Sequence, residues 1–151
     1  MTGIAVGQPV PDFTLPATGG GSWRLRSARG GAVVLYFYPR DNTPGCTLEG
    51  QDFNRLLPRL RRAAVQVVGI SRDGPASHEK FSQKMGFGFP LLSDEDERVC
   101  RLFDVIHEKN LYGRKVMGVH GTRFVPQNDK AFDDIHDLVK TLNIDLKKLN
   151  S

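Results

Sequence analysis

The longest apolar run in the chain covers residues 32–38 (AVVLYFY) and is rich in β-branched and aromatic side chains. A run of this kind is typical of a β-strand that is buried on both faces. Residues 64–71 (AVQVVGIS) predict a second buried strand. Between the two runs, four apolar residues recur at the three- and four-residue spacings of an amphipathic helix. These residues are Phe53, Leu56, Leu57 and Leu60.

Weaker signals add to this pattern of strands and helices. Pro58 lies inside the helical stripe. Because proline removes a backbone hydrogen bond, we expect the helix to bend there or to end early. Ser77 is placed to cap a second, short helix, which Gly86 ends. Residues 89–92 predict a third strand.

From residue 93 onward the pattern predicts a helix, a loop, a strand and a last helix. Ser93 and Asp96 resemble a capping box that opens the first of these helices. Its apolar stripe comprises Val99, Leu102, Phe103 and Ile106. Residues 107–113 (HEKNLYG) predict a polar loop, and residues 115–125 predict a strand. A final helical stripe runs through residues 135–149.

Strands that alternate with helices favour an α/β fold, in which a central sheet is flanked by helices. Ahead of the first buried strand, the prolines and glycines of residues 9–25 predict a small hairpin over one edge of the core. A chain of 151 residues is expected to form a single domain, residues 1–151. In such sheets the functional groups gather at the carboxyl ends of the strands, and the turn after Tyr38 lies at such an end.

Composition narrows the class of protein. Apolar residues make up 39% and charged residues 25% of the chain, which is ordinary for a soluble globular protein. No segment approaches the roughly 18 consecutive apolar residues of a membrane span. The first residues, MTGIAVGQPVPDF, lack the basic and apolar parts of a secretory signal, so we expect a cytoplasmic protein with no membrane partner. Two cysteines are too few for a disulfide scaffold, so each is expected to be reactive or buried.

The charge pattern argues against a nucleic-acid partner. The formal net charge of +4 is a mild excess, and the basic residues are dispersed apart from Arg59, Arg61 and Arg62. A nucleic-acid interface would cluster them and interleave aromatic residues. The four histidines lack the spacing of metal ligands, and there is no phosphate-cradling glycine motif. We therefore predict no metal and no cofactor.

The turn after the first buried strand holds the residues with reactive chemistry. With Thr43 as the N-cap, Pro44 takes the first helical position and Cys46 falls in the first turn. There, free backbone N–H groups and the positive end of the helix dipole favour the thiolate, the nucleophilic form of cysteine. The Thr43 hydroxyl can both donate and accept a hydrogen bond. An inert cysteine would be expected inside an apolar stripe, whereas Cys46 follows Thr-Pro-Gly.

The spacing Pro39-x-x-x-Thr43-x-x-Cys46 resembles the active-site signature of the peroxiredoxins. The wider block FYPRDNTPGCTLEGQDF is similar to the PrxQ branch, also called the bacterioferritin comigratory protein group. Three further blocks resemble that branch in the same order, and the likeness covers roughly residues 6–119. The further blocks are residues 71–81, 89–97 and 108–118.

The resemblance implies a thioredoxin-like fold and an antioxidant thiol peroxidase that reduces hydrogen peroxide or organic hydroperoxides. Cys46 would attack the O–O bond and become a sulfenic acid. Thr43 would orient the peroxide, and Pro39 would shield the site. The alternative is a thiol redox sensor or interaction protein with impaired turnover. A thioredoxin-type disulfide oxidoreductase ranks last, because Glu49 occupies the second position of a Cys-x-x-Cys motif.

The chain departs from the family pattern at the position of an arginine that the resemblance places beside the thiolate. Gly121 occupies that position, and Arg123 is the nearest arginine. Because side chains alternate along a strand, residues 121 and 123 face the same way. Arg123 is therefore the candidate substitute, although it lies about 7 Å further along the strand. From about residue 125 the likeness fades, so the C-terminal part of the domain is atypical.

A second departure concerns the resolving cysteine. Many members of the branch carry it five residues after the attacking cysteine, where this chain has Gln51. Cys100, the only other thiol, lies beside an apolar stripe and is expected to be structural, with a resolving role as the alternative. A disulfide to Cys46 would need Cα atoms within about 7 Å. We therefore expect thioredoxin, glutaredoxin or a small thiol such as glutathione to reduce Cys46, in a monomer or weak dimer.

Overall fold

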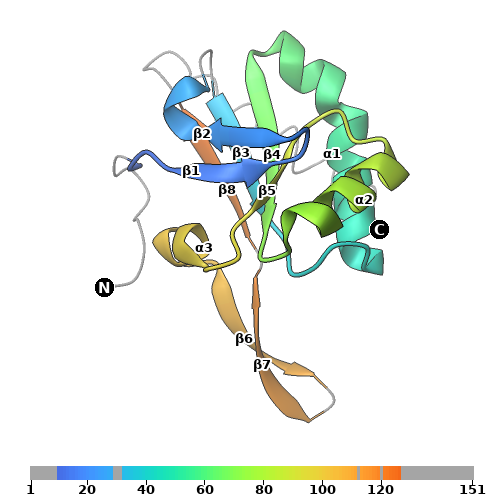
Figure 1. Ribbon diagram of the computed structural model, residues 1–151, viewed down its shortest axis with the longest axis vertical. Coiled ribbons are helices and arrows are strands. Elements are labelled where there is room, and N and C mark those ends of the chain that lie inside the picture. The colour runs from blue at the N-terminus through green and yellow to red at the C-terminus, as the bar shows by residue number, and fades with distance from the viewer. Residues whose placement is uncertain (1–9, 29–31, 112, 120, 127–151) are drawn as a thin grey trace.

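The computed structural model describes residues 10–28, 32–111, 113–119 and 121–126. At its centre is a six-stranded mixed sheet in the order β2-β1-β5-β4-β3-β8 (Figure 1). The strands are β1 (Thr14–Ala17), β2 (Gly21–Arg24), β3 (Ala32–Phe37), β4 (Val65–Ser71), β5 (Leu91–Ser93) and β8 (Gly121–Pro126). The pairs β3–β4 and β4–β5 are parallel, and the other pairs are antiparallel. This arrangement confirms the expected central mixed sheet.

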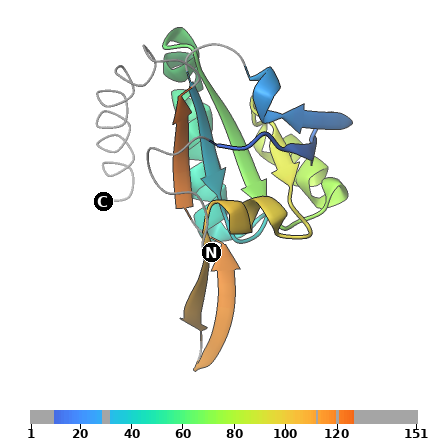
Figure 2. The same cartoon turned by 90° about the vertical axis from the view of Figure 1, so that its left-hand side faces the viewer.

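Two further strands, β6 (Ile106–Leu111) and β7 (Arg114–Val119), form a separate antiparallel hairpin. Figure 2 shows this hairpin projecting away from the sheet and its helices. The helical elements are α1 (Pro44–Arg62), α2 (Pro75–Met85), α3 (Arg98–Leu102) and the 3-10 turn η1 (Leu25–Ser27). Among the described residues, no helix is both long and apolar enough to cross a membrane.

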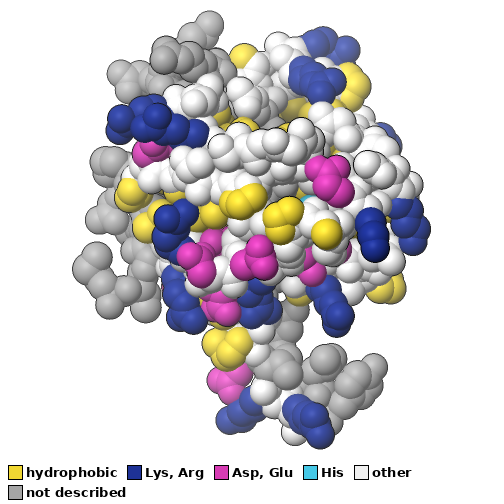
Figure 3. Space-filling view, viewed as in Figure 1, with side chains coloured by type: hydrophobic (Ala, Val, Ile, Leu, Met, Phe, Trp, Pro, Cys, Tyr) yellow, Lys and Arg dark blue, Asp and Glu magenta, His cyan; other side chains and the backbone are white. Residues whose placement is uncertain are grey.

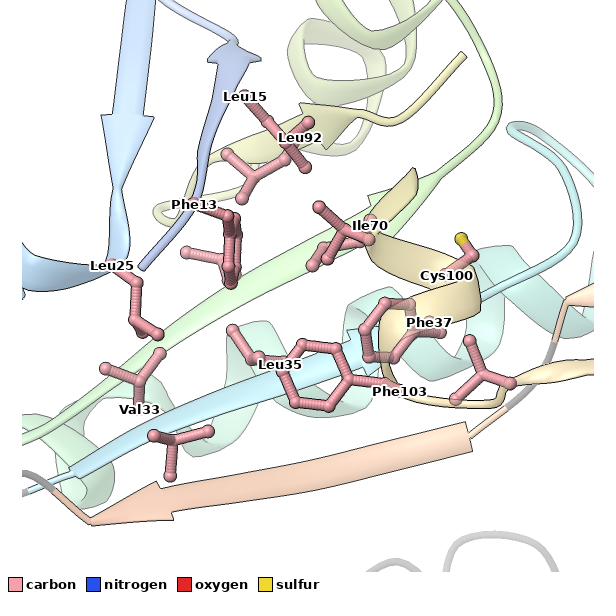
Figure 4. Packing of buried hydrophobic residues seen from close by; sticks show 14 of the residues in the cluster. Phe13, Leu15, Leu25, Val33, Leu35, Phe37, Ile70, Leu92, Cys100 and Phe103 are labelled. Atoms are coloured by element: carbon pink, nitrogen blue, oxygen red, sulfur yellow. The ribbon is translucent and has the colours of Figure 1, made fainter. Parts of the chain in front are cut away.

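The sheet separates two apolar clusters, because side chains of the fully buried strand β3 alternate between its faces. Val33, Leu35 and Phe37 belong to one cluster, together with residues of β1 and α3 (Figure 4). Val34 and Tyr36 belong to the other cluster, together with residues of α1 and α2. Helices therefore cover both faces of the sheet, as the continuous apolar run of residues 32–38 predicted.

The predicted helix after the first strand is confirmed as α1. Its four predicted apolar residues, Phe53, Leu56, Leu57 and Leu60, are all buried. Of the two alternatives for Pro58, an early end of the helix was wrong, because α1 continues to Arg62; a bend there stays a prediction. Pro58 is exposed, and burial of the opposite stripe outweighs the loss of one hydrogen bond near the end of the helix.

Helix α2 ends as predicted but begins earlier than predicted. Gly86 takes the left-handed C-cap conformation, with φ of 66°. The helix begins at Pro75, with Gly74 as the N-cap, so the prediction of Ser77 as the cap was wrong. The hydroxyl of Ser77 donates instead to Asp41, 36 residues earlier in the chain.

The predicted capping box of Ser93 and Asp96 was also wrong. Helix α3 has Glu97 as its N-cap residue, in a left-handed conformation with φ of 64°. The buried carboxylate of Asp94 accepts the backbone N–H groups of Val99 and Cys100, at 3.1 and 2.7 Å. A buried acceptor from the preceding loop thus satisfies N–H groups at the start of the helix.

The region after α3 contains more strand than the sequence predicted. The prediction of a loop at residues 107–113 was wrong, because β6 occupies most of this segment. Ile106 was predicted to lie on the preceding helix, but it begins β6. The single strand expected at residues 115–125 is two strands, β7 and β8, which lie in different sheets. The predicted helix over residues 135–149 lies outside the described residues, as does the atypical C-terminal part from residue 127.

The face shown in Figure 3 carries basic and acidic side chains that are interspersed rather than gathered by sign. Acidic residues such as Asp12 and Glu97 lie next to basic ones, in the ion pairs Asp12–Arg24 and Glu97–Arg101. The charge on this face is therefore mixed in sign.

Candidate active site

The reactive turn lies where β3 ends and α1 begins. Thr43 is the N-cap of α1 in an extended conformation, and Pro44 occupies the first turn, as predicted. The N–H of Thr47 donates to the Thr43 carbonyl at 2.8 Å, which closes the first helical turn around Cys46. The thiol therefore lies at a helix N-terminus, where N–H groups without helical partners and the helix dipole favour a negative charge.

Cys46 is a free thiol with only 6% of its surface exposed. It belongs to the cluster on the α1 face, together with Tyr36 and Phe53. Burial raises the pKa of Tyr36 well above its usual value, and the charges of Glu49 and Cys46 raise it further. Tyr36 thus stays a neutral phenol, and Cys46 and Glu49 lie close enough to influence its pKa.

Thr43 makes a hydrogen bond whose direction is unambiguous. Its Oγ1 donates to the carbonyl oxygen of Arg40 at 3.0 Å, because a carbonyl can only accept. The side chain makes no capping bond to α1. The lone pairs of Oγ1 therefore remain available to accept a hydrogen bond from a bound molecule. Pro39 is half-buried between the end of β3 and this loop.

A buried polar cluster anchors the loop before Cys46. The Asp41 carboxylate lies 2.7 Å from Nδ1 of His78 and accepts the hydroxyls of Tyr38 and Ser77 at 2.7 and 2.8 Å. Nε2 of His78 lies 2.9 Å from the Leu92 carbonyl oxygen. Burial alone would raise the pKa of Asp41, but the hydrogen bonds from His78, Tyr38 and Ser77 lower it. Asp41 is therefore an anion inside the protein.

Sequence reasoning missed this cluster. The spacing of the four histidines indicated no metal site and gave no role to His78, which is fully buried and hydrogen-bonded. Its partner Asp41 is 37 residues away along the chain, a separation that no periodicity reveals. The one available signal was the pair of adjacent polar residues Ser77 and His78 in a short predicted helix, of which Ser77 is exposed and His78 is buried. Asp73 joins the cluster by accepting the backbone N–H of Asp41 at 2.9 Å.

Asp41, Asp73 and His78 offer ligand atoms within 4.8 Å of one another, the only such group among the described residues. Their ligand atoms are already engaged in hydrogen bonds to the protein, including the bond between His78 and Leu92. The cluster therefore has the character of a satisfied hydrogen-bond network rather than a set of open metal ligands.

Glu49 lies one helical turn after Cys46 and is partly buried. Burial, together with the negative charge of Asp52, raises the pKa of Glu49 to about 7. At neutral pH a substantial fraction of this carboxyl group is therefore protonated and able to donate a hydrogen bond.

Arg123 lies on β8 opposite Leu35, whereas Gly121 lies opposite Phe37 at the end of β3. Its guanidinium donates to the carbonyl oxygens of Thr122 and Phe103, at 3.1 and 3.2 Å. It folds back over Gly121, since a Cβ atom built on Gly121 would lie 3.1 Å from Nη1 of Arg123. The guanidinium thus reaches the level of the missing family arginine but engages backbone carbonyls there.

Cys100 is fully buried in the cluster on the α3 face (Figure 4). Cys46 belongs to the cluster on the opposite face of the sheet. Burial raises the pKa of the Cys100 thiol strongly, and its hydrogen bond to Asp94 adds to this effect. Both cysteines are free. This environment fits the expected structural role, because a thiol held neutral is a poor nucleophile.

Comparisons with known proteins identify the family of the chain. The AhpC/TSA family matches residues 6–130 of the chain. Peroxiredoxin Bcp of Xanthomonas campestris is 49% identical over 127 residues, which is 83% of this chain and 79% of that protein. Peroxiredoxin Bcp of Escherichia coli K12 is 36% identical over 143 residues, covering 95% of this chain and 92% of the relative.

Solved structures resemble the chain over most of its length. A mutant of PrxQ from Xylella fastidiosa has a TM-score of 0.73 at 34% identity, covering 93% of this chain and 96% of that chain. The bacterioferritin comigratory protein of Xanthomonas campestris, described with reference to its alkyl peroxide reduction activity, has a TM-score of 0.70 at 40% identity. The match covers 87% of this chain and 90% of that chain. These neighbours confirm the expected thioredoxin-like α/β fold, and the chain belongs to the AhpC/TSA family, in the PrxQ/Bcp branch of the peroxiredoxins.

Proposed function

We propose that Cys46 is the attacking residue of this peroxiredoxin, with Thr43, Pro39 and Arg123 completing its site. As a peroxiredoxin of the PrxQ/Bcp branch, the chain is a thiol-dependent peroxidase. The observation that carries the assignment to Cys46 is its place in the first turn of α1, beside a threonine whose hydroxyl is oriented. The other cysteine is buried on the opposite face of the sheet.

The proposed reaction starts with the thiolate of Cys46. Its sulfur attacks the terminal oxygen of a hydroperoxide, so that an S–O bond forms as the O–O bond breaks. Cysteine is oxidised to the sulfenic acid, and the leaving alkoxide (or hydroxide, for hydrogen peroxide) takes a proton from solvent. Because Oγ1 of Thr43 donates to Arg40, it accepts the O–H of the peroxide and aligns the O–O bond with the sulfur.

The resolving step is proposed to use an outside thiol. That thiol attacks the sulfenic acid, releases water and forms a mixed disulfide, which a second thiol reduces to restore Cys46. Thioredoxin, glutaredoxin and glutathione are the candidate reductants. The separation of Cys100 from Cys46 by the sheet supports this route over an internal disulfide. Such reductants work in a reducing compartment, which supports a cytoplasmic location. A monomer or weak dimer is proposed with it.

One observation favours the alternative of a redox sensor with slow turnover. The guanidinium of Arg123 donates to two backbone carbonyls, so it must break these bonds before it can stabilise a thiolate or a leaving oxygen. In a sensor, Cys46 would still be oxidised rapidly, whereas repeated turnover would be slow.

Peroxide consumption with thioredoxin or a dithiol as reductant tests the assignment. Wild type is expected to turn over, Cys46→Ser to lose all turnover, and Thr43→Val to lose roughly 10²-fold, because an unaligned peroxide reacts poorly. Arg123→Ala measures whether this arginine contributes. Turnover that persists in Cys46→Ser would remove Cys46 from the mechanism. Rapid oxidation of Cys46 without turnover would favour the sensor.

A further inference from the structure

The loop between β3 and α1 is held from behind by α2. Nζ of Lys84 donates to the side chain of Asn42 at 3.0 Å, and Ser77 and His78 both hydrogen-bond to Asp41. Asn42 has a positive φ of 61°, which asparagine tolerates better than most residues. These contacts fix Asp41 and Asn42, the two consecutive residues of the loop that directly precede the N-cap Thr43.

One peptide group transmits this anchoring to the active site. The peptide bond between Arg40 and Asp41 is planar, so its C=O and N–H move together. Its N–H donates to Oδ2 of Asp73 at 2.9 Å, and its carbonyl oxygen accepts the hydroxyl of Thr43 at 3.0 Å. The orientation of the Thr43 hydroxyl is therefore set by a peptide plane whose other end is bound to Asp73.

The same peptide is also fixed through the side chain of Asp41, whose carboxylate is hydrogen-bonded to Tyr38, Ser77 and His78. It is buried against His78, and Nε2 of His78 carries a hydrogen because the Leu92 carbonyl can only accept. Nδ1 of His78 lies 2.7 Å from Oδ2 of Asp41, so the imidazole bridges the Asp41 carboxylate and the Leu92 carbonyl. A buried network whose members are all hydrogen-bonded has one well-defined geometry, and removing one member leaves its partners unsatisfied.

We propose that Asp41 and His78 are positioning residues of the peroxidase site, which orient the Thr43 hydroxyl through the Arg40–Asp41 peptide. Neither residue touches the peroxide. Their loss lets the peptide plane rotate, so that Thr43 no longer aligns the O–O bond while Cys46 remains in the first turn of α1. This inference rests on the proposed function, and it predicts a defect in the reaction with peroxide that is larger than any defect in general thiol reactivity.

The test compares two reactions of Cys46 in Asp41→Asn, His78→Gln and the double variant. The first is the single-turnover rate constant with a hydroperoxide, and the second is alkylation by iodoacetamide, which needs the thiolate but not Thr43. We expect the peroxide rate constant to fall on the order of 10–100-fold in each single variant, as for a misaligned reactant. The alkylation rate is expected to stay close to that of wild type. The double variant is expected to lose no more than the worse single variant, because the two residues act as one unit.

Asp94→Asn is the matched control. Like Asp41→Asn, it replaces a buried, hydrogen-bonded aspartate, but this aspartate accepts two backbone N–H groups of α3. It is expected to lower stability while keeping the ratio of the two rates. Tyr38→Phe removes one hydrogen bond from Asp41 and keeps both the carboxylate and the imidazole. It serves as a milder variant in case the others fail to fold. It is expected to lower the peroxide rate in the same direction by a smaller factor.

The outcomes separate the inference from the proposed function. Folded variants with a wild-type peroxide rate, or with both rates lowered equally, would overturn the positioning role. Absence of any reaction between wild-type Cys46 and peroxide would instead overturn the proposed function.

Discussion

Replacing Gly121 with alanine is expected to destabilise the protein for two structural reasons. The φ angle of Gly121 is +154°, a region that residues with a Cβ atom rarely adopt. A Cβ atom there would lie 3.0 Å from Cγ1 of Val105, which is fully buried and has no free space to move into. It would also lie 3.1 Å from Nη1 of Arg123, the flexible end of a long side chain.

The backbone strain dominates the expected cost. Residues held in such regions cost of order 1–3 kcal/mol. For a protein of this size each kcal/mol lowers the melting temperature by about 2–4 °C, so Gly121→Ala should melt roughly 2–12 °C below wild type. The contact with Arg123 adds little, because the guanidinium can swing away.

Thermal and urea unfolding, followed by circular dichroism, measure this cost. Gly21→Ala is the control, because Gly21 is exposed and a Cβ atom there would have open space without a positive φ. A melting temperature of Gly121→Ala equal to that of Gly21→Ala would refute the reasoning. Gly121→Arg introduces the arginine that the resemblance implies at this position, and it should be destabilised at least as much because it carries the same backbone strain. Its gain in peroxidase activity is therefore expected to be smaller than the added charge alone would give.

Two further predictions concern buried groups. Cys100→Ala should lose about 1 kcal/mol of unfolding free energy, the cost of removing one small group from a packed core. The variant should keep its peroxide turnover. Loss of turnover with an outside dithiol present would show that Cys100 takes part in the reaction. Burial and Asp52 raise the pKa of Glu49 to about 7, so folding favours its protonated form, and wild type loses this stabilisation as pH rises from about 4.5 through 7. Glu49→Gln should therefore be more stable relative to wild type at pH 8 than at pH 5 by urea unfolding, and an equal difference at both values would contradict the raised pKa.

The elements that the sequence predicted best are those with strong local signals. The run at residues 32–38 became the central strand β3, and the stripe after it became the buried face of α1. The N-cap at Thr43 was also predictable, because Thr-Pro-Gly carries the chemistry of a helix start. These features place Cys46 without any knowledge of tertiary contacts.

The errors arose where distant residues decide the local structure. Ser77 has the side chain of a helix cap but donates to Asp41, and Gly74 is the N-cap of α2 instead. Asp94, rather than Ser93, accepts the N–H groups of Val99 and Cys100 at the start of α3, whereas Asp96 accepts that of Arg98. In each case a hydrogen bond to a buried carboxylate replaced the capping bond that the sequence predicted.

The hairpin of β6 and β7 was missed for a different reason. Its residues are mostly polar, with Glu108 and Lys115 pairing across it at 3.7 Å. A hairpin that projects from the body buries little on either face, so it lacks the alternation of apolar and polar residues that marks a half-buried strand. The contacts of Arg123 could not be predicted either. Alternation along a strand predicts that it faces the same way as Gly121, but not which carbonyls its guanidinium binds.

Mass spectrometry after one equivalent of hydroperoxide tests the central claim most directly. With a sulfenic-acid trapping reagent present and no reductant, we expect one oxidised cysteine, Cys46, and a fully reduced Cys100. Addition of a dithiol should return Cys46 to the thiol. Oxidation that appears first on Cys100, or a Cys46–Cys100 disulfide in the native protein, would contradict an attacking Cys46 that is resolved by an outside thiol.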